Sequence, residues 1–292
     1  MSKPYLIAAT HTPMDASGEI NFAAVPKMVD FVLGQGADGL FLCGSTGEFP
    51  SLSTEERMEV TQAFFESAKG RAPIYVHVGH SNLQEARALA AHAAKIGVDA
   101  IAAAPPSYFR PTTLEALVDS LVYIAQGAPD MPLYYYHIPP LTGVNFRMAE
   151  FLERADKHLP SLAGIKFSSA ELDDLVASIH YGDGRYTILF GCDEMLLAGL
   201  AMGAAGAVGS TYNFFGPQYR SMLEAFNDGR LEDAQQFQLE VTRKVHQILK
   251  FGGANAIKAA MSILGVDVGP PRLPLKALNE TQRKELERLL RP

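Results

Sequence analysis

The stretch Leu162-Ala163-Gly164-Ile165-Lys166-Phe167-Ser168-Ser169 is an apolar run that contains a single lysine. Its length and composition predict a β-strand, in which successive side chains point to opposite faces. Ile165 and Phe167 would then face a covering helix, whereas Lys166 and Ser168 would face whatever the strand encloses. The pattern therefore predicts a buried amine.

A buried lysine has a distinctive chemistry. Burial disfavours the ammonium form, and the usual relief is a lowered pKa. The neutral amine of Lys166 could attack a carbonyl carbon to form a Schiff base, which then withdraws electrons from the neighbouring carbon. The alternative is a lysine whose stem follows apolar surface until its amine reaches water. The strand-end segments described below favour the nucleophile.

Composition and charge narrow the class of protein. The 292 residues are 48% hydrophobic and 20% charged, which is ordinary globular composition. The net charge is −7, with no long block of either sign, so neither nucleic acid nor an acidic membrane is a predicted partner. A small molecule is the predicted partner.

The two cysteines, Cys43 and Cys192, lack the paired spacing of a zinc site or a disulfide framework, which predicts buried thiols in a reducing compartment. No apolar stretch approaches the ~20 residues of a membrane span, and a strand-like run begins at Tyr5. We expect a cytoplasmic protein.

Short apolar runs alternate with amphipathic segments along the chain, and no hairpin signal separates them. This pattern predicts an α/β fold, a closed (β/α)₈ TIM barrel, rather than an open doubly wound sheet, whose Gly-x-Gly-x-x-Gly turn is missing. The eight predicted strands are Tyr5–Thr10, Gly39–Gly44, Pro73–Gly79, Ala100–Ala104, Pro132–Ile138, Leu162–Phe167, Tyr186–Gly191 and Gly206–Gly209.

Three further helices are predicted beyond the eighth strand, over Leu231–Phe251, Ala254–Leu264 and Glu280–Leu290. We therefore divide the chain into a catalytic barrel, residues 1–220, and a helical extension, residues 221–292. The extension is expected to pack on the barrel or between subunits.

The second predicted strand ends in Gly44-Ser45-Thr46-Gly47-Glu48. Glycines beside adjacent hydroxyls allow backbone N–H and side-chain O–H groups to converge on a small anion. A phosphate loop would need the lysine and spacing of a Walker motif, which are absent, so a carboxylate is the expected guest. A simple tight turn is the other interpretation.

The fifth predicted strand contains Tyr134, Tyr135, Tyr136 and His137. Tyr134 and Tyr136 share one face, and Tyr136 is nearer the strand's end. An inward phenol beside a lysine can move protons during Schiff-base chemistry. Tyr135, and Tyr134 with it, fit the simpler role of packing.

Four motifs together resemble a known family: Gly44–Glu48, Tyr136–Pro139, Gly164–Lys166 and Gly209–Asn213. In order and over nearly the whole chain, they resemble the pyruvate-dependent class I aldolases of the dihydrodipicolinate synthase and N-acetylneuraminate lyase superfamily. The segment Gly269–Leu275 extends the resemblance to the C-terminal region of the animal lyases.

The resemblance implies a role for each matching residue. Lys166 would form the Schiff base with pyruvate, Tyr136 would move protons, and Ser45 with Thr46 would hold the pyruvate carboxylate. Tyr108 falls where many members place a tyrosine that reaches a neighbouring subunit, so it is an accessory to the proton relay. The resemblance also implies a homotetramer, and no metal or other cofactor.

Two further features favour the N-acetylneuraminate branch, which would split N-acetylneuraminate reversibly into N-acetylmannosamine and pyruvate. Leu141 replaces the arginine with which dihydrodipicolinate synthases bind a second carboxylate. Asp193 and Glu194 resemble the acid pair that these lyases place on a polyhydroxylated tail, although acids there could also cap a helix. The predicted sugar site consists of Ser168, Gly191, Asp193, Glu194 and Ser210.

Other functions fit less well. Another pyruvate-dependent aldolase or dehydratase acting on a 2-keto-3-deoxy sugar acid stays open, because Phe167 stands where bacterial lyases carry a polar residue. A metal enzyme would need converging ligands, and the nearest pair, His77 and His80, would point to opposite faces of a strand. A sugar-sensing regulator would be expected to lack Lys166 or Tyr136.

Overall fold

The structure is a computed structural model that describes residues 4–291. Eight strands close into a barrel in chain order, which confirms the predicted (β/α)₈ fold with additional C-terminal helices. The pairs with a described register are parallel. The strands are β1 (Tyr5–Ala9), β2 (Gly39–Leu42), β3 (Ile74–His77), β4 (Ala100–Ala103), β5 (Leu133–His137), β6 (Leu162–Phe167), β7 (Thr187–Phe190) and β8 (Gly206–Gly209).

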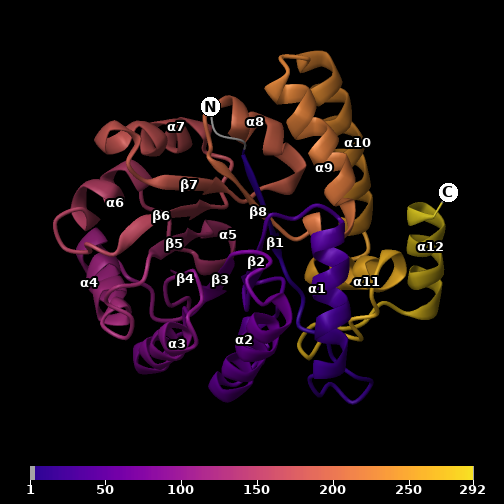
Figure 1. Ribbon diagram of the computed structural model, residues 1–292, viewed down its shortest axis with the longest axis horizontal. Helices are drawn as coiled ribbons and strands as arrows, with labels where there is room; N and C mark the ends of the chain where they lie inside the picture. Colours follow the sequence, from indigo (N-terminus) through magenta and orange to yellow (C-terminus); the bar gives the residue numbers. More distant parts are fainter. Residues whose placement is uncertain (1–3, 292) are drawn as a thin grey trace. The chain divides into compact units, whose positions relative to one another are not determined.

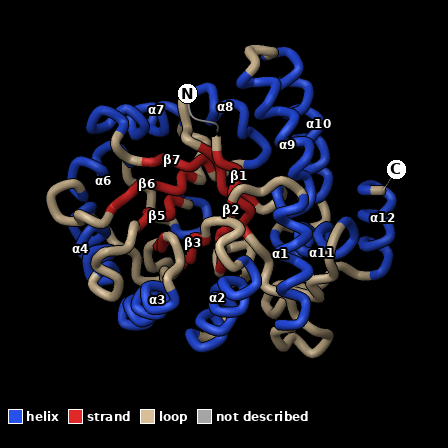
Figure 2. The backbone as a smooth tube through the Cα atoms, in the orientation of Figure 1, coloured by secondary structure: helices blue, strands red, loops and turns tan. Residues whose placement is uncertain are grey.

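Helices alternate with the strands, as Figure 1 shows along the chain and Figure 2 by type of structure. Four short 3₁₀ turns accompany them in the described residues, η1 (Phe22–Ala24), η2 (Phe49–Ser51), η3 (Tyr181–Gly184) and η4 (Asp193–Met195). The α-helices are α1 (Val25–Gly34), α2 (Thr54–Ala68), α3 (Leu83–Ile96), α4 (Leu114–Ala125), α5 (Pro139–Thr142), α6 (Met148–Ala155), α7 (Leu172–His180), α8 (Leu196–Ala201), α9 (Tyr212–Asn227), α10 (Leu231–Leu249), α11 (Ala254–Leu264) and α12 (Glu280–Leu290).

Local chemistry sets several helix ends. Ser53 and Glu56 form a capping box at the start of α2, each side chain accepting a hydrogen bond from the other residue's backbone N–H. Gly97 ends α3 at a φ of +84°, a conformation that favours glycine. The α1 helix begins at Val25 with Pro26 in its first turn, where a missing N–H costs nothing.

The described residues form two compact units. The first contains β3 to β7 and nearly all of β8, in residues 4–5, 73–192 and 198–208. The second contains nearly all of β1, together with β2, α1, α2 and α9 to α12, in residues 6–72, 193–197 and 209–291.

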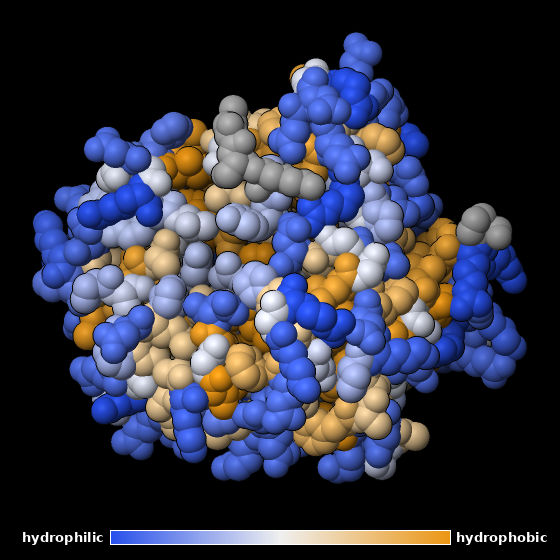
Figure 3. Space-filling model, in the orientation of Figure 1, coloured by the Kyte–Doolittle hydropathy of each residue, from blue (hydrophilic) through white to orange (hydrophobic). Residues whose placement is uncertain are grey.

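The last helices belong to the second unit. The α10 helix packs against α9, and α11 packs against both α10 and α12. Leu286 is the buried side chain of α12, and the outer surface of this helix is hydrophilic in Figure 3. Among the helices of residues 4–291, none combines the length and the apolar character that a membrane crossing requires.

Candidate active site

Lys166 and Tyr136 lie side by side on neighbouring strands. The register of β5 and β6 pairs these two residues directly. Only 4% of Lys166 and 3% of Tyr136 are exposed, and the Lys166 Nζ lies 3.9 Å from the centre of the Tyr136 ring. In its charged form, a lysine amine over an aromatic face is attracted by the ring's quadrupole. The buried lysine and the predicted proton donor are thus in contact.

Ring contacts confirm which face each strand residue occupies. On one face, Tyr136 meets His77 of β3, with 5.7 Å between ring centres. On the other face, the Tyr135 ring is 4.7 Å from Phe151 of α6, and the His137 ring is 5.1 Å from Phe167. The predicted alternation along β5 and β6 is therefore correct.

The two histidines considered as metal ligands have other roles. His77 ends β3, and its Nε2 accepts a hydrogen bond from the Ala104 N–H (3.1 Å). His80 lies in the following loop, where its Nδ1 accepts from the Asn82 N–H (2.9 Å). His80 does not share a strand with His77, contrary to the prediction, because β3 ends at His77. Within residues 4–291, no three His, Cys, Asp or Glu side chains gather to hold a metal ion.

Ser168 and Gly191 are packed against each other beyond the ends of β6 and β7. The Gly191 N–H donates to the Phe167 carbonyl (2.8 Å), and a Cβ on Gly191 would lie 2.0 Å from the Ser168 Oγ. A larger residue at position 191 would displace the Ser168 side chain. The Ser168 N–H in turn donates to the His137 carbonyl (2.8 Å), which ties this pair to β5.

Ser45 and Thr46 lie in a turn that follows β2, and both are half-buried. The Glu48 N–H donates to the Ser45 carbonyl (3.1 Å), which closes the turn. The Thr12 hydroxyl donates to the Gly47 carbonyl (2.7 Å). Glu48 has a φ of +57°, in the left-handed region that a side chain normally disfavours.

A second buried lysine belongs to this region. The Nζ of Lys258, on α11, lies 2.5 Å from the Glu48 Oε1, and both side chains are 2% exposed. Burial lowers the pKa of Lys258, while the Glu48 carboxylate opposes that change. The pKa of nearby His11 is lowered to about 3, first by burial and then by the Lys258 charge. Because its amine is held by a carboxylate, Lys258 is a poor nucleophile.

Asp193 is held by the start of α9. Its Oδ2 accepts hydrogen bonds from the Thr211 N–H (2.8 Å) and hydroxyl (2.7 Å). A Cβ on Gly209 would lie 1.8 Å from the Asp193 Oδ1, so the carboxylate occupies the space that a larger residue would need. The Ser210 carbonyl accepts from the Asn213 side-chain amide (2.7 Å).

Glu194 presents a different environment from its neighbour. Its backbone carbonyl accepts a hydrogen bond from the Thr242 hydroxyl (2.7 Å), and the residue is half-buried. The carboxylate of Asp193 is thus anchored within the fold, whereas Glu194 is anchored through its backbone.

The loop after β4 is exposed. Tyr108 is 82% exposed and stacks edge-on against Phe109, with 5.0 Å between ring centres. Leu141 of α5 is 63% exposed, and a Cβ on nearby Gly143 would meet the Arg110 guanidinium. Arg110 thus brings to α5 a positive charge that the sequence around Leu141 does not indicate.

The predicted site residues fall into two groups, one in each unit. Lys166, Tyr136, Ser168, Gly191 and Tyr108 belong to the first unit, where Lys166 meets Tyr136 and Ser168 meets Gly191. Ser45, Thr46, Asp193, Glu194 and Ser210 belong to the second. The contacts of His77, Thr211 and Lys258 were not predicted. The period of β3 could have placed His77 on the face of Tyr75, but no local pattern points to the other two.

The chain belongs to the dihydrodipicolinate synthetase family, whose model matches residues 4–292. Among curated relatives, the rat N-acetylneuraminate lyase is 41% identical over 93% of this chain and 86% of its own length. The chicken N-acetylneuraminate lyase is 41% identical over 94% of this chain and 91% of its own.

Solved structures give the same picture. The N-acetylneuraminate lyase of Proteus mirabilis matches with a TM-score of 0.95 and 34% identity, over 98% of this chain and 97% of that protein. The sialic acid aldolase of Aliivibrio salmonicida matches with a TM-score of 0.95 and 36% identity, over 100% and 97%.

Proposed function

We propose that this protein is a class I aldolase that cleaves N-acetylneuraminate reversibly to N-acetylmannosamine and pyruvate. The observation that carries the proposal is the buried Lys166 amine against the Tyr136 ring. It occurs in a chain about 40% identical to N-acetylneuraminate lyases over most of its length.

The chemistry follows from these two side chains. The Lys166 amine attacks the ketone carbon of the 2-keto acid, water leaves, and an iminium forms. The bond between the adjacent carbon and the hydroxyl-bearing carbon then breaks as a base removes the hydroxyl proton. The aldehyde departs, and the electron pair enters the iminium to give an enamine. Protonation of the enamine and hydrolysis release pyruvate and restore Lys166, and the Tyr136 phenol is the group proposed to move these protons.

The remaining residues are assigned to substrate binding. Ser45 and Thr46 bind the carboxylate, while Ser168, Gly191, Asp193, Glu194 and Ser210 bind the polyol. Tyr108 is an accessory whose exposure suits contact with another subunit of a homotetramer. We also propose that the reaction needs no metal or other cofactor and that the protein acts in the cytoplasm. The division at residue 220 stays a prediction.

Two measurements on the wild-type protein test the proposal. Incubation with N-acetylneuraminate should release pyruvate and N-acetylmannosamine in equal amounts, and borohydride with pyruvate should add mass at Lys166. Labelling at Lys258 instead would overturn the lysine assignment. Trapping at Lys166 without cleavage of N-acetylneuraminate would keep the aldolase mechanism and remove the substrate, which would favour a different 2-keto-3-deoxy acid.

A further inference from the structure

Glu48 combines an unfavourable backbone conformation with a buried charge. A positive φ is normally given to glycine, and a buried carboxylate must be paired to be tolerated. Both costs fall on the last residue of the turn that contains Ser45 and Thr46. A glycine would relieve the backbone but would leave the buried Lys258 ammonium without its carboxylate, so the contacts of the Glu48 carboxylate are what this position provides.

Those contacts come from the C-terminal part of the chain. Lys258 binds one carboxylate oxygen, and the Arg272 backbone N–H donates to the other (2.9 Å). The Arg272 guanidinium binds both oxygens of Glu56, at 2.7 and 2.6 Å, and donates to the Ser51 carbonyl (3.0 Å). Arg272 thus hydrogen-bonds to Glu48 in the turn and to Ser51 and Glu56 beyond it.

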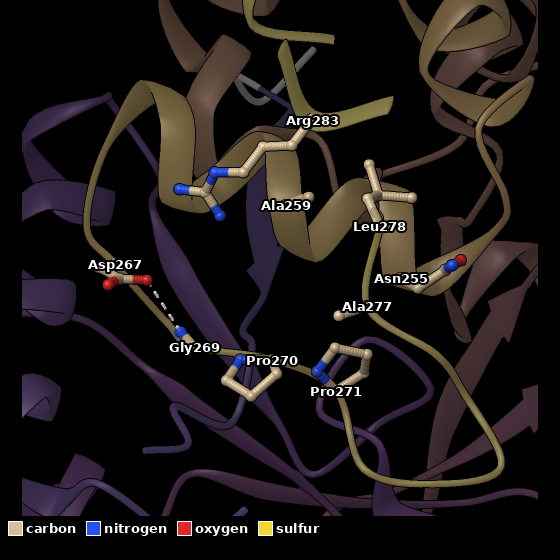
Figure 4. A pocket seen from close by; sticks show the side chains of 9 residues that line it. All are labelled: Asn255, Ala259, Asp267, Gly269, Pro270, Pro271, Ala277, Leu278 and Arg283. Atoms are coloured by element: carbon tan, nitrogen blue, oxygen red, sulfur yellow. Dashed lines mark hydrogen bonds between the residues drawn. The ribbon is translucent and has the colours of Figure 1, made fainter. Parts of the chain in front are cut away.

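The segment that carries Arg272 is itself fixed. The Met14 N–H donates to the Val268 carbonyl (3.0 Å), and a Cβ on Gly269 would lie 1.9 Å from the Met14 carbonyl. The Gly269 N–H donates to the Asp267 carboxylate (3.1 Å), the dashed line in Figure 4. Pro270 and Pro271, which come directly before Arg272 in the sequence, line a cavity of about 220 Å³ (Figure 4). Two prolines restrict the backbone further.

We infer that Lys258 and Glu48 are positioning residues that hold the 45–48 turn in the conformation that binds the substrate carboxylate. The inference rests on the proposed role of Ser45 and Thr46, and it deepens that role. The Glu48 N–H closes the turn onto the Ser45 carbonyl, so any rotation of Glu48 moves the two hydroxyl residues. Lys258 and Arg272 prevent that rotation by holding both carboxylate oxygens.

Lys258→Met tests the inference. We expect the pyruvate concentration for half-maximal borohydride trapping at Lys166 to rise about ten-fold or more, the scale of one lost hydrogen bond. The maximal extent of trapping should stay near the wild-type value, because Lys166 and Tyr136 are untouched. A variant that is less stable but keeps the wild-type half-saturation would show a merely structural pair and overturn the inference.

Two further variants keep the test decisive. Glu48→Gln preserves size and an acceptor for Arg272, so it is the deciding variant if Lys258→Met does not fold; unchanged half-saturation there overturns the inference. In Lys258→Met/Glu48→Gln the stranded buried charge is gone, so stability should recover while half-saturation stays raised.

The matched control is Lys284→Met, which breaks an exposed pair with Glu280 at a similar separation, 2.6 Å against 2.5 Å for Lys258 and Glu48. It should leave half-saturation at the wild-type value. An equal rise in this control would overturn the inference, because the effect would then be a general one of lost charge. If the wild type is not trapped by pyruvate at all, the proposed function fails as well. If the wild type is trapped and the Lys258 and Glu48 variants have the same half-saturation as the wild type, the proposed function stands and the positioning role fails.

Discussion

Two of the lysines in residues 4–291 are buried in apolar stretches, and their amines meet different groups. Lys166 on β6 is 4% exposed and Lys258 on α11 is 1% exposed. The amine of Lys166 lies against the face of Tyr136, whereas the amine of Lys258 lies 2.5 Å from the Glu48 carboxylate. Apolar neighbours along the chain therefore do not reveal what a lysine does. Its role depends on what the amine meets from distant parts of the sequence.

The largest expected difference between the two lysines is in catalysis. Lys166→Met should lower kcat for N-acetylneuraminate cleavage by about 10⁴–10⁶-fold, the scale on which removing a covalent nucleophile acts. A pyruvate-release assay measures the effect, and mass spectrometry after borohydride should find no label. At saturating substrate, Lys258→Met should retain most of kcat. If Lys258→Met is inactive and Lys166→Met still turns over, the assignment of Lys166 as the nucleophile is wrong.

The second test concerns the ring beside Lys166. Tyr136→Phe keeps the aromatic face but removes the hydroxyl, so kcat should fall by about 10²–10⁴-fold if the phenol moves protons. Single-turnover kinetics should show the loss in the chemical step. Tyr135→Phe is the matched control, since Tyr135 packs against Phe151 on the opposite face. Equal kinetics for the two variants would reduce Tyr136 to packing.

For the free energy of unfolding we expect the opposite ranking, with Lys258→Met losing more stability than Lys166→Met. Lys258→Met strands the buried Glu48 carboxylate, which should cost about 3–5 kcal/mol in the free energy of unfolding. Lys166→Met removes an amine–ring contact and leaves an apolar stem, so a change of about 1 kcal/mol is expected. Urea unfolding at pH 7 compares them. A larger loss in Lys166→Met would mean that Lys166 is the structural lysine.

Variants of Asp193 and Glu194, which follow β7, test whether sugar binding can be impaired without affecting either buried lysine. Asp193→Asn should lower kcat/KM for N-acetylneuraminate about 10–100-fold, as expected for one charge-assisted hydrogen bond. Glu194→Gln should act in the same direction, without disturbing the Thr211 contacts of Asp193. Trapping of pyruvate at Lys166 should be unaffected in both. Wild-type kcat/KM in both variants would remove these acids from the sugar site.

The smallest expected effect concerns His137, a buried base that is neutral, in contrast to Lys258, which is paired with a carboxylate. Burial lowers the pKa of His137 to about 4 from an ordinary value of 6.5. Between these values the unfolded chain binds a proton that the folded protein excludes, so stability falls as the pH falls from 6.5 to 4. His137→Phe should reduce that loss by about 1–3 kcal/mol, measured as unfolding free energy against pH.

The matched control for His137 is His180→Phe, at an exposed position. It should leave the dependence on pH as in the wild type. His11, whose pKa is lowered to about 3, will keep the His137 variant partly acid-sensitive. A pH dependence unchanged by His137→Phe would show that folding does not lower the pKa of His137.

The barrel and the Lys166–Tyr136 contact could be predicted from sequence because both depend on short-range periodicity. Alternating strands and helices produce the barrel, and the two-residue period of β5 and β6 puts both side chains on one face. The Glu48–Lys258 pair joins residues 210 positions apart, and no local pattern marks it. The third strand was predicted to run to Gly79, whereas β3 ends at His77, and only the backbone hydrogen bonds define that end. His80 therefore lies in the following loop and not on a strand.

The hydrogen bond from the Arg272 N–H to the Glu48 carboxylate joins residues that are 224 positions apart in the sequence. On a ribosome, Ser45 and Thr46 are made early, but the backbone N–H that binds the Glu48 carboxylate exists only after residue 272 has been synthesised. Until then, the Glu48 carboxylate must stay hydrated, with its turn open to water. Contacts of such sequence separation form late and slowly in folding. We therefore expect the nascent chain to assemble helices and strands as it grows, and to fix the Ser45–Thr46 turn in position only once its C-terminal segment arrives.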